Sequence, residues 1–215
     1  EIDQCLVGSE MCIRDSSKYI FWVSILFIWI LSTISDRIWW DLYSNTPSWD
    51  QADYLNSALD HARALSFLGG DGASDFSSLL DKSPKIPPLA SIINGAVIAF
   101  AGDAPHQAAW SLSFWNGFLI FNIASWGLYL RGKIFGLFCV LISACSPFLF
   151  HLRTDYVLEL PLISAITFYL FHLGRWSDKS IGGKWIQLLI ATCACSFSLL
   201  IKQSSLLVII PVSYT

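Results

Sequence analysis

Residues 89 to 102 read LASIINGAVIAFAG, and this apolar stretch decides how the rest of the chain can be arranged. A membrane-spanning helix needs about 20 apolar residues, whereas stretches of roughly 10 to 14 more often form interfacial or re-entrant segments. We therefore predict that residues 89 to 102 form a short helix at or in one leaflet of a membrane, and that this helix does not cross.

The basic residues favour the same topology. If residues 89 to 102 do not cross, six basic residues of short loops lie on one side of the membrane, which the positive-inside rule assigns to the cytoplasm. These residues are Lys18, Arg131, Lys133, Arg175, Lys179 and Lys184. If the segment crosses, five of them move outside. The first arrangement places the loop 36–88, Asp103 and the turn from Arg153 to Asp155 together on the extracytoplasmic face.

The composition agrees with a membrane protein. Hydrophobic residues make up 54% of the chain and charged residues 13%, and the mean hydropathy is +0.56. An ordinary soluble domain is about 25% charged. We therefore predict an all-α, polytopic transmembrane helical bundle. Its expected spans are residues 19–35, 109–130, 134–150, 156–173 and 185–201, with Pro161 breaking the fourth early. The net charge of −3 argues against a nucleic-acid partner.

The segment 36–88 is predicted to be an extracytoplasmic loop. Within it, residues 50 to 68 are expected to form a helix near the membrane surface, because Leu55, Leu59 and Ala62 recur at helical spacing. Residues 1–16 (EIDQCLVGSEMCIRDS) resemble translated sequencing-adapter sequence, and residues 212–215 resemble the start of a similar tail. We expect the natural part to run from about residue 17 to 211, to continue beyond it in the gene, and to be inactive alone.

Two clusters in this loop have residues that can carry chemistry. In SWDQADY, residues 48–54, a carboxylate near the interface can act as a general base toward a hydroxyl. Alternatively, Ser48 or Asp50 caps the following helix. In KIPPL, residues 85–89, Lys85 can bind a phosphate as a point charge, or its side chain can simply reach up to the headgroups.

Two further clusters follow. In HLRTDYVLE, residues 151–159, Arg153 and Asp155 lie at an outer turn, and Glu159 shares a helical face with Asp155. Carboxylates inside a span are costly and usually functional, but an Arg–Asp pair with a polar helix contact is the structural alternative. In IKQSS, residues 201–205, Lys202 is a second candidate for an anionic headgroup, or an ordinary boundary residue. No metal motif is present, and the spacing Cys193-x-Cys195 is not that of a zinc or redox site.

The order of these clusters resembles that of membrane glycosyltransferases that use polyprenyl-phosphate sugars. That group includes protein O-mannosyltransferases, aminoarabinose transferases of lipid A and core-oligosaccharide transferases of rhizobial type. The matching elements are Asp50 to Tyr54, Lys85 to Leu89, Gly102-Asp103, Arg153 to Asp155, and Lys202 to Ser204. The sequence departs from the pattern at Ile86, which is inserted in the Lys-Pro-Pro element, and by the absence of an arginine after Gly102-Asp103.

The resemblance implies a GT-C-type helical fold, integral to the bacterial inner membrane, with its site on the extracytoplasmic side. It implies an inverting transfer of a sugar from a polyprenyl-phosphate-linked donor to a lipid, glycan or protein hydroxyl. Asp50 or Asp53 would be the base, with Tyr54 beside it. Asp155 would orient the acceptor, or hold a divalent cation if one is used.

The donor phosphate would be bound by cationic groups at headgroup depth, which would stabilise the leaving group. The candidates are Lys85, Arg153 and Lys202, and Glu159 is a further candidate site residue. Two other classes of function are alternatives to a glycosyltransferase. A transporter fragment predicts more polar residues deep in the spans. A scaffold subunit predicts that neutralising the candidate residues leaves function intact.

Overall fold

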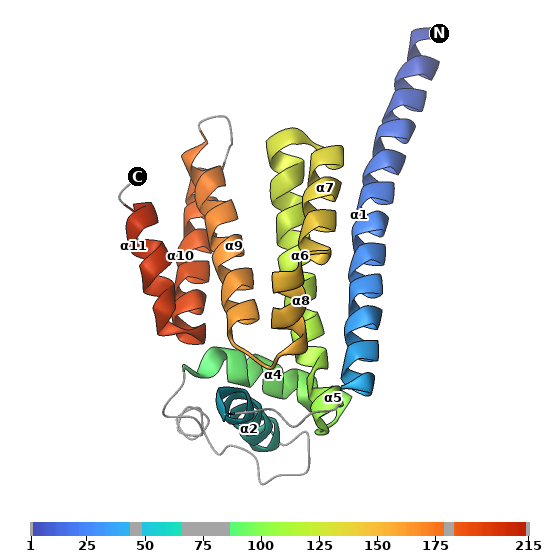
Figure 1. The fold of residues 1–215 in the computed structure, drawn as a ribbon. Helices are drawn as coiled ribbons and strands as arrows, with labels where there is room; N and C mark the ends of the chain where they lie inside the picture. The colour runs from blue at the N-terminus through green and yellow to red at the C-terminus, as the bar shows by residue number, and fades with distance from the viewer. Residues whose placement is uncertain (1, 44–48, 66–86, 179–182, 214–215) are drawn as a thin grey trace.

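The computed structural model describes residues 2–43, 49–65, 87–178 and 183–213, and these residues form helices and short connections without a strand. Most of the longer helices stand roughly upright in Figure 1. They are α1 (Ile2–Leu42), α6 (Trp110–Arg131), α7 (Lys133–Ala144), α9 (Glu159–Ser177) and α10 (Lys184–Ile201), with the shorter α11 (Leu206–Ser213) beside α10. α8 (Pro147–Thr154) follows α7 after a bend. The all-α prediction is therefore confirmed for the described residues.

The remaining described helices gather at one end of the upright set. They are α2 (Trp49–Ala64), α4 (Pro88–Ala101), α5 (Pro105–Ala108) and the 3-10 turn η1 (Gln203–Ser205). α4 begins directly after Pro87, with Pro88 in its first turn, where a missing N–H costs nothing. It lies across the lower ends of the upright helices and does not run beside them (Figure 1). We call this end of the fold the α4 end.

Two of the described helices are long and apolar enough to cross a membrane: α1 from Lys18 to Leu42, and α10. α7 and α8 pass the same test as a pair, but they are bent by 60° at the break between them. α6 and α9 have the length of a span but carry more polar side chains, including Asn116 and Asn122 in α6. Both asparagines are buried among neighbouring helices.

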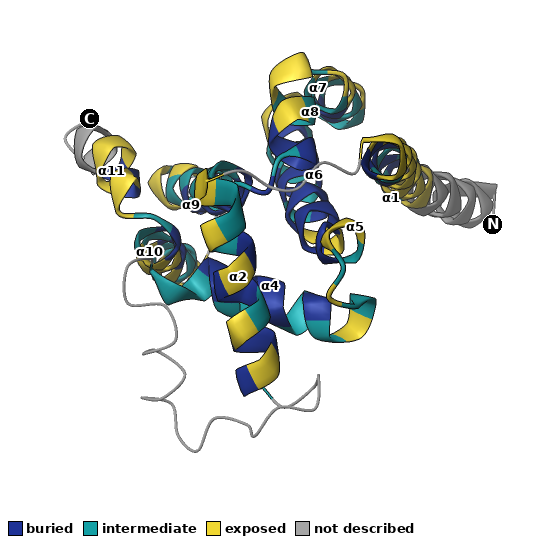
Figure 2. Ribbon diagram, turned by 60° about the horizontal axis from the view of Figure 1, so that its bottom comes forward, coloured by how far each residue is buried: buried dark blue, intermediate teal, exposed yellow. Residues whose placement is uncertain are grey.

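α6 is the central helix. Figure 2 shows it buried along most of its length, with α1, α7 and α9 around it. Its contact with α7 is close because Gly127 faces Gly136, and a Cβ on Gly127 would lie 2.5 Å from the Gly136 Cα. Its contact with α1 is polar as well as apolar, since the Asn116 amide donates to the Ser32 hydroxyl at 2.8 Å.

Two predicted spans differ in detail from the structure. Residues 134–150 do not form one helix, because Cys145 and Ser146 separate α7 from α8 and Pro147 begins α8. Pro161 does not break a helix. α9 begins at Glu159, so the proline lies in the first turn, where no backbone donor is lost.

The predicted surface helix 50–68 corresponds to α2, and residues 66–68 lie outside the described residues. Of the three residues expected on its inner face, Leu55 and Ala62 are buried and Leu59 packs against the core. α2 crosses α4 at Gly95, where an added Cβ would lie 2.8 Å from the Ala58 carbonyl oxygen and 2.8 Å from the Ala62 nitrogen. Figure 2 shows the exposed residues of α2 and the buried residues of α4 at this crossing.

Gly95→Ala should therefore separate α2 from α4, because both atoms that the new methyl group would meet are backbone atoms. We expect a loss of about 1–3 kcal/mol in the free energy of unfolding, measured by denaturation in detergent. Gly174→Ala on α9 is the matched control, since nothing lies within 4 Å of its added Cβ. Equal stability of the two variants would contradict the close crossing.

Candidate functional site

The α4 end contains a buried ion pair between α1 and α8. The Arg153 Nε donates to both carboxylate oxygens of Asp36, at 3.2 and 2.9 Å. The side chains are only 3% and 1% exposed, respectively. Two hydrogen bonds to one carboxylate hold the pair in a fixed geometry, which a buried pair requires if attraction is to offset its desolvation.

Arg153 has further contacts with the break in the α7–α8 pair. Its Nη1 lies 3.4 Å from the Ala144 carbonyl oxygen, one of the carbonyls at the end of α7, and its guanidinium lies 5.6 Å from the centre of the Phe150 ring. The sequence-based interpretation assigned Arg153 to a donor phosphate. In the structure its guanidinium faces Asp36 and is enclosed.

Sequence reasoning did not single out Asp36, which was placed at the start of the loop 36–88. In the structure it lies inside α1, within the apolar segment from Lys18 to Leu42. A carboxylate in the last turns of such a helix was the available signal, because an ionised group there requires a partner. Its neighbour Arg37 donates to the carbonyl oxygens of His106 and Ala109, at 2.6 and 2.9 Å, and so holds α5.

Asp155 directly follows α8, two residues after Arg153, but it faces a different partner. Its Oδ2 lies 3.2 Å from the His151 Nε2, and its side chain is 30% exposed. The next residue, Tyr156, is buried, and burial raises its pKa to about 12. The Ser111 hydroxyl donates to the Tyr156 oxygen at 3.3 Å, which anchors the connection to α6.

A second group of polar side chains, on α2, at the start of α9 and directly after α10, consists of the Tyr54 phenol and the charged groups within electrostatic range of it; we call it the polar cluster. Its members are Asp50, Asp53, Tyr54, Glu159 and Lys202. The Lys202 ammonium forms an ion pair with the Glu159 carboxylate. Burial is the main cause that raises the pKa of the Tyr54 phenol, and the charge of Lys202 opposes it. The carboxylates that raise this pKa further are, in decreasing order of effect, Asp50, Glu159 and Asp53.

The structure thus brings five of the eight predicted site residues together in the polar cluster. Arg153 and Asp155 lie at the same end but on α8, with Asp36 and His151 as their partners. Lys85 lies outside the described residues. Asp50 and Asp53 are both exposed in the first turns of α2, and Asp50 shares a helical face with Tyr54 at a separation of four residues.

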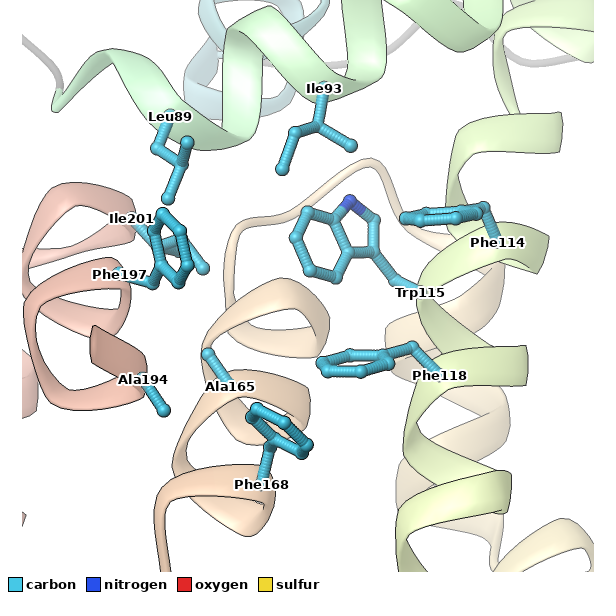
Figure 3. A pocket seen from close by; sticks show the side chains of 10 residues that line it. All are labelled: Leu89, Ile93, Phe114, Trp115, Phe118, Ala165, Phe168, Ala194, Phe197 and Ile201. Carbon is cyan, nitrogen blue, oxygen red and sulfur yellow. The ribbon is translucent and has the colours of Figure 1, made fainter. Parts of the chain in front are cut away.

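An apolar cavity of about 250 Å³ lies between α4, α6, α9 and α10 (Figure 3). Its lining residues are Leu89, Ile93, Phe114, Trp115, Phe118, Ala165, Phe168, Ala194, Phe197 and Ile201. The indole nitrogen of Trp115 donates to Asn94 Oδ1 at 2.7 Å, so this polar atom is already satisfied. Ile201 directly precedes Lys202, so the chain passes in one step from the cavity wall to the polar cluster.

In the part of the chain that the structure describes, no group of three His, Cys, Asp or Glu side chains could hold a metal ion. Comparison with known proteins adds no assignment. No protein-family model matches the chain, and neither a curated protein nor a solved structure matches it. The resemblance to membrane glycosyltransferases therefore rests on the residues of the chain alone.

Removing one partner of the Asp36–Arg153 pair should be strongly destabilising, because it leaves the other charge buried. We expect Asp36→Ala to lower the free energy of unfolding by about 3–5 kcal/mol, measured by denaturation in detergent. The control is Asp60→Ala, whose partner Arg63 forms an exposed pair with it at 3.5 Å. That variant should lose at most about 1 kcal/mol. Similar losses for both would contradict a dry, essential pair.

Proposed function

We propose that this chain is part of a membrane glycosyltransferase that transfers a sugar from a polyprenyl-phosphate-linked donor to a hydroxyl of a lipid, glycan or protein. The observation that carries the proposal is the polar cluster. At the α4 end, carboxylates and an ammonium group from distant parts of the sequence lie within electrostatic range of the Tyr54 phenol, near an apolar cavity, and Glu159 and Lys202 form an ion pair. Such a place suits a substrate that has a lipid chain and an anionic head.

The chemistry of the transfer fits the residues of the polar cluster. The leaving group is a phosphate held at the membrane surface, and Lys202 would stabilise the negative charge that develops on it. Arg153 is enclosed with Asp36, so we propose Lys202 as the main described cation for this role. Lys85 remains a second candidate from the sequence. The cavity would receive the part of the lipid chain nearest the phosphate.

The acceptor hydroxyl must lose a proton during transfer, and a carboxylate positioned nearby can accept it. We propose Asp50 for this role, because it is exposed in the first turn of α2 and shares a helical face with Tyr54. Asp53 is the alternative base. Asp155, at the end of α8, would orient the acceptor.

We also propose a membrane arrangement, from the hydropathy of the helices and the positions of their basic residues. α1, α10 and the α7–α8 pair have the hydropathy of spanning helices, and we propose that α6 and α9 cross among them as the polar, buried members of a polytopic bundle. Arg131, Lys133, Arg175 and Lys184 lie near helix ends away from α4. By the positive-inside rule those ends are cytoplasmic, which puts the polar cluster on the extracytoplasmic side of a bacterial inner membrane.

Labelling of single cysteines would test this orientation. In a variant without native cysteines, Asn56→Cys on α2 should react in intact cells with a maleimide that cannot cross the inner membrane. Arg131→Cys at the end of α6 should react only after the membrane is permeabilised. Both positions are exposed in the structure. The reverse pattern, or labelling of both in intact cells, would overturn the proposed topology.

Replacement of the base would test the proposed activity. Asp50→Asn in the complete gene product should lower the transfer rate by about 100-fold or more, the usual contribution of a general base. The rate is measured in membranes as the release of polyprenyl phosphate from polyprenyl-phosphate-linked sugars.

Asp53→Asn distinguishes the two candidate bases, and Asp60→Asn is the matched control on the same helix. The control should retain the activity of the unmodified protein, because Asp60 pairs only with the exposed Arg63 among its described ion pairs. Full activity of both the Asp50 and Asp53 variants would overturn the proposed reaction.

A further inference from the structure

We propose that Glu159 is a built-in competing anion, which occupies Lys202 when no lipid phosphate is bound and which the phosphate must displace. This inference rests on the proposed function, in which Lys202 binds the phosphate of the donor. It assigns Glu159 a role that lowers affinity, opposite to that of a residue that helps to bind the ligand.

The positions of the two residues support an exchangeable contact. Glu159 is the first residue of α9, and Lys202 follows the last residue of α10 with an extended backbone, φ −156° and ψ 129°. Both therefore lie at helix ends, on the side of the fold where α4 lies. The pair joins two elements that pack side by side, and it can open without moving either helix.

The exposure of the pair decides between a fixed and an exchangeable role. The side chains of Lys202 and Glu159 are 30% and 40% exposed, whereas those of Arg153 and Asp36 are 3% and 1% exposed. The Lys202–Glu159 contact is therefore only partly covered by the fold. A partly exposed ion pair contributes little stability, so we expect an incoming phosphate to replace the carboxylate at small cost.

Competition between Glu159 and the phosphate for Lys202 matters most for release of the product. The lipid-linked donor is a phosphodiester with one negative charge. Transfer of the sugar leaves a phosphate monoester, which carries about −1.5 to −2 at neutral pH. The monoester is attracted more strongly to Lys202 than the donor is. A carboxylate that returns to the ammonium group favours release of the product.

The test measures binding of farnesyl phosphate, a short polyprenyl phosphate, to this chain in lipid nanodiscs by isothermal titration calorimetry. Farnesol, which lacks the phosphate, corrects for partition into the bilayer. Glu159→Gln should lower the Kd for farnesyl phosphate by up to about fivefold, the range of an exposed ion pair. Lys202→Gln should raise the Kd, and adding Glu159→Gln to it should bring no gain. Asp60→Asn is the matched control for loss of one negative charge at this surface, and it should leave the Kd unchanged.

The outcomes separate this inference from the proposed function. If Lys202→Gln weakens binding but Glu159→Gln weakens it too or leaves it unchanged, Glu159 is not a competitor and the inference is overturned. If Lys202→Gln has no effect, Lys202 does not bind the phosphate and the proposed function loses its main cation. If Asp60→Asn strengthens binding as much as Glu159→Gln does, the gain is a general charge effect, which also overturns the inference.

Discussion

The dry ion pair between Asp36 and Arg153 constrains the architecture of the α4 end. Two opposite charges withdrawn from water are tolerated only when they remain together, so α1 and α8 cannot separate without a large cost in free energy. The next residue of α1, Arg37, binds the carbonyl oxygens of His106 and Ala109. Asp36 thus holds the end of α8 through Arg153, and Arg37 holds α5 and the residue that precedes α6.

This constraint determines which groups remain available for chemistry. Arg153 supports the end of α7 through the Ala144 carbonyl and neutralises Asp36, so its charge is used within the fold. Lys202, in contrast, lies at the end of α10 with a partly exposed partner. Two cations near helix ends therefore have different roles, and the burial of the partner of each one decides which role it has.

The helices could be predicted from the sequence more completely than the side-chain contacts between them. Apolar length and Pro87-Pro88 were enough to predict a short helix at 89–102, and helical spacing was enough to predict the buried face of α2. The break at Ser146-Pro147 was missed because hydropathy continues across it. Asp36 was missed as a partner because Arg153 lies 117 residues away, and no local pattern connects them. The polar cluster was predicted as separate motifs, but its pairing of Glu159 with Lys202 depends on how α9 packs against α10.

The helices that carry the polar cluster differ in how many neighbours hold them. α9 packs against α10 and α6, and α10 also packs against α4, whereas the main contact of α2 is with α4, at the crossing over Gly95 and through the hydrogen bond between the Ser57 and Ser91 hydroxyls. The carboxylates of α2 therefore depend on one helix–helix contact, while Glu159 and Lys202 lie at the ends of helices that are held from several sides. In the proposed reaction this difference is useful. The cation proposed to bind the phosphate would stay in place, and the helix that carries the proposed base would adjust to the acceptor because a single neighbouring helix restrains it.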